Sequence, residues 1–161
     1  MGQQQLLLVI LVTIIVGIAT VVAINTFGSA ADAANIDSVR QDIAQIAAAA
    51  QGYYMKPGML GGGSRSFSGI DFNQFAFAGT VNDADATIAF NENGTYKITP
   101  SGTDDLELTI EAWPASNDDY GTPPSEVGPS LEATALANDM QWVRNVPGGT
   151  TQTGDDGTTG G

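Results

Sequence analysis

An unbroken apolar run begins close to the start of the chain. Residues Leu6 to Ile24 read LLLVILVTIIVGIATVVAI, and only Thr13, Gly17 and Thr20 interrupt the apolar side chains. About 20 consecutive apolar residues are enough for a helix to cross the hydrocarbon core of a bilayer. A helix that is apolar on every side needs lipid or other apolar helices around it. The pattern therefore predicts a helix that is buried in a membrane or among other helices and not within the fold of its own chain.

Further along, the apolar positions narrow to a single helical stripe. The stripe repeats at spacings of three or four residues and consists of Ile36, Val39, Ile43, Ile46, Ala50 and Tyr53. The opposite face carries Asp37, Arg40, Gln41 and Asp42. Since no proline occurs before Pro57, we expect one helix from about residue 6 to about residue 54, weakest at Gly28. Ile36, Val39, Ile43 and Ile46 are the residues expected to dock a globular head.

Alternating runs in the second half of the chain predict strands. Residues 86–90 and 95–99 alternate between apolar and polar positions and flank Asn91-Glu92-Asn93-Gly94. Asn-Gly between two such runs is a hairpin signal, because both residues tolerate a positive φ. Residues 106–113 form the next alternating run, with Leu106, Leu108, Ile110 and Ala112 on one face. The pattern predicts a three-stranded antiparallel meander whose apolar side covers the helix stripe.

The segments on either side of this meander are less regular. Residues 57–69 form a Gly-rich stretch that reads as a flexible connector. Residues 131–136 and 140–146 are either a second hairpin, turning at Asn138-Asp139, or a short helix from Leu131 to Val143. The predicted fold class is α+β, with a long N-terminal helix and an antiparallel sheet packed on its second half. The expected parts are an apolar helix over 1–27, its amphipathic continuation over 28–54, and a β-rich head over 55–161 that ends in a Gly-, Thr- and Asp-rich tail.

Composition removes several classes of function. The chain contains no Cys and no His, which excludes disulfides, thiolate nucleophiles and Cys/His zinc sites. Five basic residues face 18 acidic ones, a net charge of −13. Such a chain repels phosphate, so nucleic acid is not an expected partner. No charged side chain precedes Asp32, so any association with a membrane must come from apolar burial and not from a basic patch.

Two local motifs suggest binding or modification, and a third is rejected. Asp118 and Asp119 offer hard oxygen ligands that suit Ca²⁺, although a solvated turn is the simpler interpretation. Asn93-Gly94-Thr95 fits a glycosylation sequon, but the same residues also fit a hairpin turn. Gly61-Gly62-Gly63-Ser64 lacks the Gly-Lys-Ser/Thr element of a phosphate-binding loop. Nothing marks a catalytic cleft, so we expect no enzyme activity, no catalytic residues and no cofactor.

The N-terminal segment resembles the type IV pilins. Residues 15–27 read IVGIATVVAINTF, which is similar to the family's IIGILAAIAIPNF register. The start, GQQQLLL, resembles bacterial pilin-like sequences that lack the usual Glu at the fifth mature position, where this chain has Gln5. Archaeal pilins, which often lack that Glu too, are also possible relatives. A second departure is Asn25, where the family often has Pro.

The resemblance implies a filament subunit that is held in the inner membrane before assembly. It implies processing by a prepilin peptidase, methylation of the new amino terminus, expected at Met1, and extraction by the pilus assembly machinery. The expected partner in the extracellular filament is a further copy of the chain. The expected polymerisation core consists of Leu6, Leu7, Ile10, Ile14, Gly17, Ile18, Val21, Ile24 and Phe27.

Two other functional classes fit the same pattern. One is a membrane-anchored pseudopilin or surface binding domain of a secretion system, which would use the apolar run only as an anchor. The other is an enzyme on a membrane anchor. A signal peptide fits less well, because the apolar run is long and no positively charged region precedes it.

Overall fold

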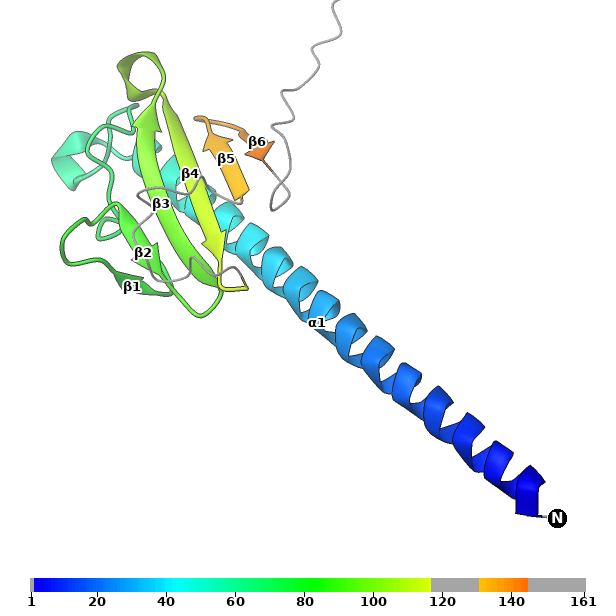
Figure 1. The fold of residues 1–161 in the computed structure, drawn as a ribbon. Coiled ribbons are helices and arrows are strands. Elements are labelled where there is room, and N and C mark those ends of the chain that lie inside the picture. The colour runs from blue at the N-terminus through cyan, green and yellow to red at the C-terminus, as the bar shows by residue number, and fades with distance from the viewer. Residues whose placement is uncertain (1, 117–130, 145–161) are drawn as a thin grey trace, which may run out of the picture. The chain divides into compact units, whose positions relative to one another are not determined.

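A computed structural model describes residues 2–116 and 131–144 (Figure 1). The chain divides into two compact units, residues 1–34 and residues 35–161, and each is described by itself. Helix α1 (Gly2–Met55) supplies the described part of the first unit and the beginning of the second. It runs through Gly28 without a break, so the predicted weak point does not interrupt the helix.

The second unit contains a six-stranded antiparallel sheet in which strand order follows chain order. The strands are β1 (Thr80–Val81), β2 (Ile88–Phe90), β3 (Gly94–Ser101), β4 (Glu107–Pro114), β5 (Leu131–Ala135) and β6 (Met140–Arg144). Two 3₁₀ turns, η1 (Gly58–Leu60) and η2 (Thr103–Asp105), lie in the connections. The α+β prediction is confirmed, and the predicted meander and second hairpin join into one sheet. The alternative helix over residues 131–143 was wrong.

One face of the sheet forms the core of the second unit together with α1. Val39, Ile43, Ile46, Ala47 and Ala50 are the buried residues of the helix. They belong to the same cluster as the inward-facing residues of β3, β4 and β5. Leu106 was expected to share this face, but it precedes β4 and is 45% exposed. The alternation of β4 begins instead at Leu108, which is fully buried.

The connector after the helix contributes more to the core than its glycines suggest. Phe67, Ile70 and Phe72 are all buried. The backbone N–H groups of Phe67 and Phe72 donate to the carbonyl groups of Asp105 and Ala86. These bonds attach the connector to two loops of the sheet. The prediction of a flexible, Gly-rich connector over residues 57–69 therefore overlooked Phe67, and it did not anticipate that Ile70 and Phe72, just beyond it, join the same core.

The β2–β3 hairpin exists for a different reason from the one predicted. The backbone of Asn93 and Gly94 does not adopt the positive φ that the predicted turn requires. The loop is held instead by Asn91, whose Oδ1 accepts hydrogen bonds from the N–H groups of Asn93 and Gly94. Gly94 is needed for space, because a Cβ there would lie 2.4 Å from the carbonyl oxygen of Trp113 on β4.

We therefore expect Gly94→Ala to destabilise the head by about 1–3 kcal/mol, because the backbone of Trp113 cannot yield without breaking the β3–β4 ladder. Gly52→Ala is the matched control, since a Cβ at Gly52 has open space around it. Thermal unfolding of both variants checks the difference. Equal melting temperatures would contradict the packing argument.

The other face of the sheet carries a row of charged cross-strand neighbours. Lys97, Glu111 and Glu132 pair in register across β3, β4 and β5. Burial raises the pKa of Glu111 above its ordinary value; Lys97 opposes this rise and Glu132 adds to it. A raised carboxyl pKa means that the charged form is disfavoured in the folded state. Glu111 therefore costs stability at neutral pH, and this cost disappears once the group is protonated in both states.

Because the raised pKa of Glu111 means that its charge destabilises the folded head, we expect Glu111→Gln to stabilise the head at pH 7. The advantage should shrink as the pH falls through the raised pKa and vanish below the ordinary glutamate pKa of about 4.3. Glu92→Gln, which removes the same charge from an exposed loop position, is the control. Denaturant unfolding across this pH range measures both variants against the parent. A constant difference at all pH values would contradict the linkage.

Candidate functional site

The largest unusual surface of the protein is the apolar part of α1. From Leu6 to Phe27, every large aliphatic or aromatic side chain is exposed, from 48% at Val12 to 76% at Phe27. The exposed residues occupy all sides of the helix, since consecutive positions such as Leu6, Leu7 and Leu8 are all included. Soluble monomers rarely expose an apolar surface of this extent. This segment therefore requires an apolar environment that the single chain does not supply.

The hydroxyl side chains of this segment, and that of Ser29 just after it, donate to carbonyl groups of the helix itself. Thr13 Oγ1 donates to the carbonyl of Ile10, and Thr20 Oγ1 donates to that of Val16. Thr26 and Ser29 make the equivalent bonds to Val22 and Asn25. Hydroxyl groups bonded in this way can enter an apolar environment at little cost. The three threonine hydroxyls of the segment are thus compatible with its burial.

The helix is also long and apolar enough to cross a membrane. Its most apolar window has a mean hydropathy of 3.2, and none of that window is buried by the rest of the described chain. This property rests on length and composition, and a signal sequence has it too. Anchoring in a membrane and burial among copies of the same helix make the same physical demand, which is the removal of apolar surface from water.

The predicted site residues fall into two environments. All nine residues of the predicted polymerisation core are exposed on α1: Leu6, Leu7, Ile10, Ile14, Gly17, Ile18, Val21, Ile24 and Phe27. Val39, Ile43 and Ile46 are buried in the head, and Ile36 is partly buried against the same core. Met1 lies outside the described residues.

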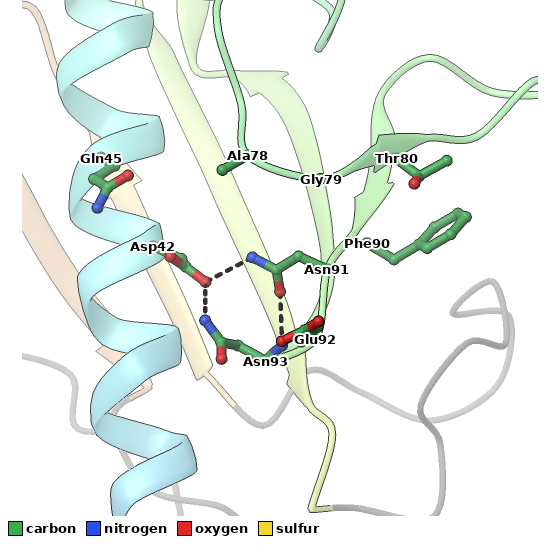
Figure 2. A pocket seen from close by; sticks show the side chains of 9 residues that line it. All are labelled: Asp42, Gln45, Ala78, Gly79, Thr80, Phe90, Asn91, Glu92 and Asn93. Carbon is green, nitrogen blue, oxygen red and sulfur yellow. Dashed lines mark hydrogen bonds between the residues drawn. The ribbon is translucent and has the colours of Figure 1, made fainter.

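A second feature, a polar cluster in the head, was missed by the sequence pattern. Asp42 was placed on the outer face of the helix, but it is partly buried and its Oδ2 accepts three hydrogen bonds. The donors are Asn91 Nδ2 at 2.9 Å, Asn93 Nδ2 at 2.8 Å and the Tyr96 hydroxyl at 2.6 Å. One carboxylate of α1 therefore ties the β2–β3 loop to the helix (Figure 2).

The cluster borders a surface hollow of about 500 Å³. Figure 2 shows Gln45, Ala78, Thr80 and Phe90 among the residues around it. Because the oxygen of Asp42 that faces the cluster already has three donors, the cluster is a structural clamp. Its signal in the sequence was the run Asn91-Glu92-Asn93, two amide residues around a turn. Nothing indicated their shared partner Asp42, which lies 49 residues before Asn91 and 51 before Asn93.

The same geometry bears on the glycosylation motif. Asn93 donates its side-chain amide to Asp42, and Thr95 is buried at 2% exposure. Both residues that a glycosyl transfer needs to reach are therefore engaged in the folded head. Glycosylation at Asn93 stays a prediction, and in the folded state it requires this clamp to open.

The acidic loop before β2 forms turns and does not gather ligands. Asn82 Oδ1 accepts from the N–H of Ala84, and Asp85 Oδ1 accepts from both the N–H and the hydroxyl of Thr87. The bonds from Thr87 lower the pKa of Asp85. Within residues 2–116 and 131–144, no three acidic side chains gather in a way that could hold a metal ion. The calcium candidates Asp118 and Asp119 lie outside the described residues.

Comparison with known proteins identifies no relative. No protein-family model matches this chain, and neither the curated proteins nor the solved structures include a significant match. The exposed apolar segment of α1 is therefore the main indication of function.

Proposed function

We propose that this protein is the structural subunit of an extracellular, type IV pilus-like filament. In this proposal the apolar part of α1 holds the subunit in the membrane before assembly and forms the filament core afterwards. The observation that carries the proposal is the uncharged helical segment from Leu6 to Phe27, which is exposed on every side. The proposed partners are further copies of the chain, together with the pilus assembly machinery and a prepilin peptidase.

Lipid or other apolar helices can cover a helix of this kind. Burial of apolar surface stabilises by about 25 cal/mol per Å², so moving an all-round apolar helix out of water is strongly favourable. Both a bilayer and a bundle of identical helices remove this surface from water. The hydroxyl groups already bonded within the helix permit either environment. One segment can therefore serve first as an anchor and then as a polymer core.

The composition of the head supports a scaffold more than a catalyst. The described head residues form one packed core with a polar clamp. In the loops around Asp71 and Asp85, the acidic side chains accept hydrogen bonds from nearby backbone N–H groups. A net charge of −13 keeps such heads soluble while the apolar helices associate.

Microscopy of cells that make the protein tests the proposal directly. Material sheared from the cell surface should contain thin filaments in negative stain, and intact-mass measurement should find this chain as their main component. A strain lacking the gene is the control. Absence of filaments, with the chain retained in the membrane fraction, would favour the membrane-anchored pseudopilin or binding domain.

The division of the chain at residue 34 yields a further prediction about the head. A fragment of residues 35–161 retains every residue of the buried core, so we expect it to fold, stay soluble and remain monomeric. Sedimentation velocity measures its size, and circular dichroism measures its strand content. Large assemblies of this fragment would mean that the head, and not the apolar helix, drives polymerisation.

A further inference from the structure

A second apolar surface lies at the C-terminal end of α1, on the 55–65 loop, which comprises residues Met55 to Arg65. Met59 is 100% exposed, Leu60 is 68% exposed and Met55 is 66% exposed. These large apolar side chains belong to the head but do not pack into its core. Their exposure leaves apolar area in water that contributes nothing to the stability of the single head.

The loop holds these residues with an ordered set of hydrogen bonds. Gly63 N–H donates to the Tyr53 carbonyl, Ser64 N–H to that of Lys56, and Arg65 N–H to that of Tyr54. Gly58 N–H donates to Ser64 Oγ at 2.6 Å. The chain thus folds back onto the last turn of α1 and is bonded to it at several points.

Backbone conformation in the loop also departs from the ordinary. Ser64 and Arg65 have φ values of 50° and 74°, in the left-handed region that favours glycine. A Cβ at Gly63 would lie 1.9 Å from the carbonyl oxygen of Ser66. Residues in such conformations persist only where their surroundings impose them, and they gather at binding surfaces. The loop therefore holds Met59 and Leu60 in a fixed, exposed position before any partner binds.

The charge of this region is opposite to that of the rest of the head. Between Asp42 and Asp71 the only charged residues are Lys56 and Arg65, and both are exposed. Only Asp32, Asp37 and Asp42 precede this stretch, so the other 15 acidic residues follow it. Neither Lys56 nor Arg65 forms an ion pair with any residue that the structure describes. The loop is an apolar surface with a basic rim on an acidic protein.

From these observations we propose that the 55–65 loop docks on the acidic head surface of a second copy of this chain. The complementary charge is present on every copy, whereas two basic residues are fewer than the roughly four to eight typical of segments that bind anionic lipid. Two identical loops placed face to face would bring their basic residues together, so the loop is expected against a different surface. In a filament such a loop-to-surface contact is heterologous and repeats along the polymer, while the apolar part of α1 supplies the main association. This inference rests on the proposed filament and names a head-to-head contact within it.

The absence of cysteine from the chain allows a specific probe. Met59→Cys introduces a single thiol at a fully exposed position, and its rate of reaction with a maleimide is measured in detergent-dispersed subunits and in filaments. We expect at least about a tenfold slower reaction in filaments, as for a side chain in the water-excluded centre of an interface. Ala76→Cys, at an exposed position before β1 with no acidic residue within four positions, is the matched control and should react at similar rates in both states.

A charge-reversal variant tests the basic rim. Lys56→Glu with Arg65→Glu should lower the temperature at which filaments dissociate while leaving the unfolding temperature of the head unchanged, since both side chains are exposed. Equal dissociation temperatures for this variant and the parent would contradict the role of charge in the contact.

The remaining outcomes separate this contact from the proposed function. If the thiol of the Met59→Cys variant reacts as fast in filaments as in free subunits, the docking contact is overturned and the proposed function stays intact. Equal protection of the thiols in the Met59→Cys and Ala76→Cys variants would also overturn it. Protection of dispersed Met59→Cys subunits by phosphatidylserine vesicles would replace the second copy with a lipid surface. Absence of wild-type filaments would defeat both proposals.

Discussion

Replacement of Ile14 by Asp should abolish filaments. Ile14 lies in the middle of the uncharged segment and is 55% exposed in the single chain, so any burial of this residue occurs through other molecules. An Asp at the centre of an apolar helix costs about 2.5–3.5 kcal/mol on insertion into a membrane. In a polymer the same cost recurs in every subunit. We expect filament yield to fall below detection in negative-stain counts of sheared material.

Two controls separate assembly from other effects of that substitution. Gln41→Asp adds the same charge to an exposed position of α1 within the head and should leave filament yield close to that of the parent. Ile14→Val keeps the position apolar and should assemble normally. Because Ile14→Asp can also block membrane insertion, the amount of subunit in the membrane fraction is measured alongside. A normal filament yield from Ile14→Asp would defeat the assignment of residues 6–27 as the polymerisation core.

Replacement of Asp42 by Ala should produce one of the largest losses of stability available in the head. The substitution removes the acceptor of three hydrogen bonds and leaves the donors of Asn91, Asn93 and Tyr96 without it. Hydrogen bonds to a charged group contribute about 1.5–3 kcal/mol each, but the site is only partly buried and water can replace some of them. We expect a loss on the order of 3 kcal/mol, measured by urea unfolding of the detergent-dispersed chain.

Other variants locate the origin of that loss. Asp37→Ala removes a carboxylate from the same helix that is 72% exposed and bonded to Arg40, and it should cost little. Tyr96→Phe removes one donor from the clamp and should cost about 1 kcal/mol. If the two residues act through their shared bond, the double variant with Asp42→Ala should lose less than the sum of the single losses. Strict additivity would show that the clamp is not a coupled unit.

That one continuous helix carries two kinds of apolar pattern was predictable from the sequence, although the pattern changes near residue 28 and the compact units divide after residue 34. An all-round apolar run and a stripe repeating at three or four residues have different spacings, and both belong to one helix without an internal proline. The same reasoning located the residues that the head buries, since Val39, Ile43 and Ile46 follow the stripe. Alternation likewise located the centres of β3 and β4, whereas residues 131–136, which form β5, were left open between a strand and a short helix.

What the pattern missed depends on residues distant in the chain. Phe67, Ile70 and Phe72 follow a Gly-rich run with no periodicity, and only the position of the sheet makes them core residues. Alternation also did not determine that the strands form one six-stranded sheet. It describes which side chains share a face of a strand and not which strands are neighbours.

By itself, then, the sequence determined where apolar surface lies along α1, because helical and strand periods are short-range properties of the chain. Only the tertiary structure decided the role of Asp42, which periodicity placed with the solvent-facing polar residues. Its partners Asn91, Asn93 and Tyr96 are 49 to 54 residues away. Only the sheet, packed on the helix, brings those donors to one carboxylate oxygen. The left-handed backbone at Ser64 and Arg65 was also hidden, because it arises from bonds between the 55–65 loop and the last turn of the helix.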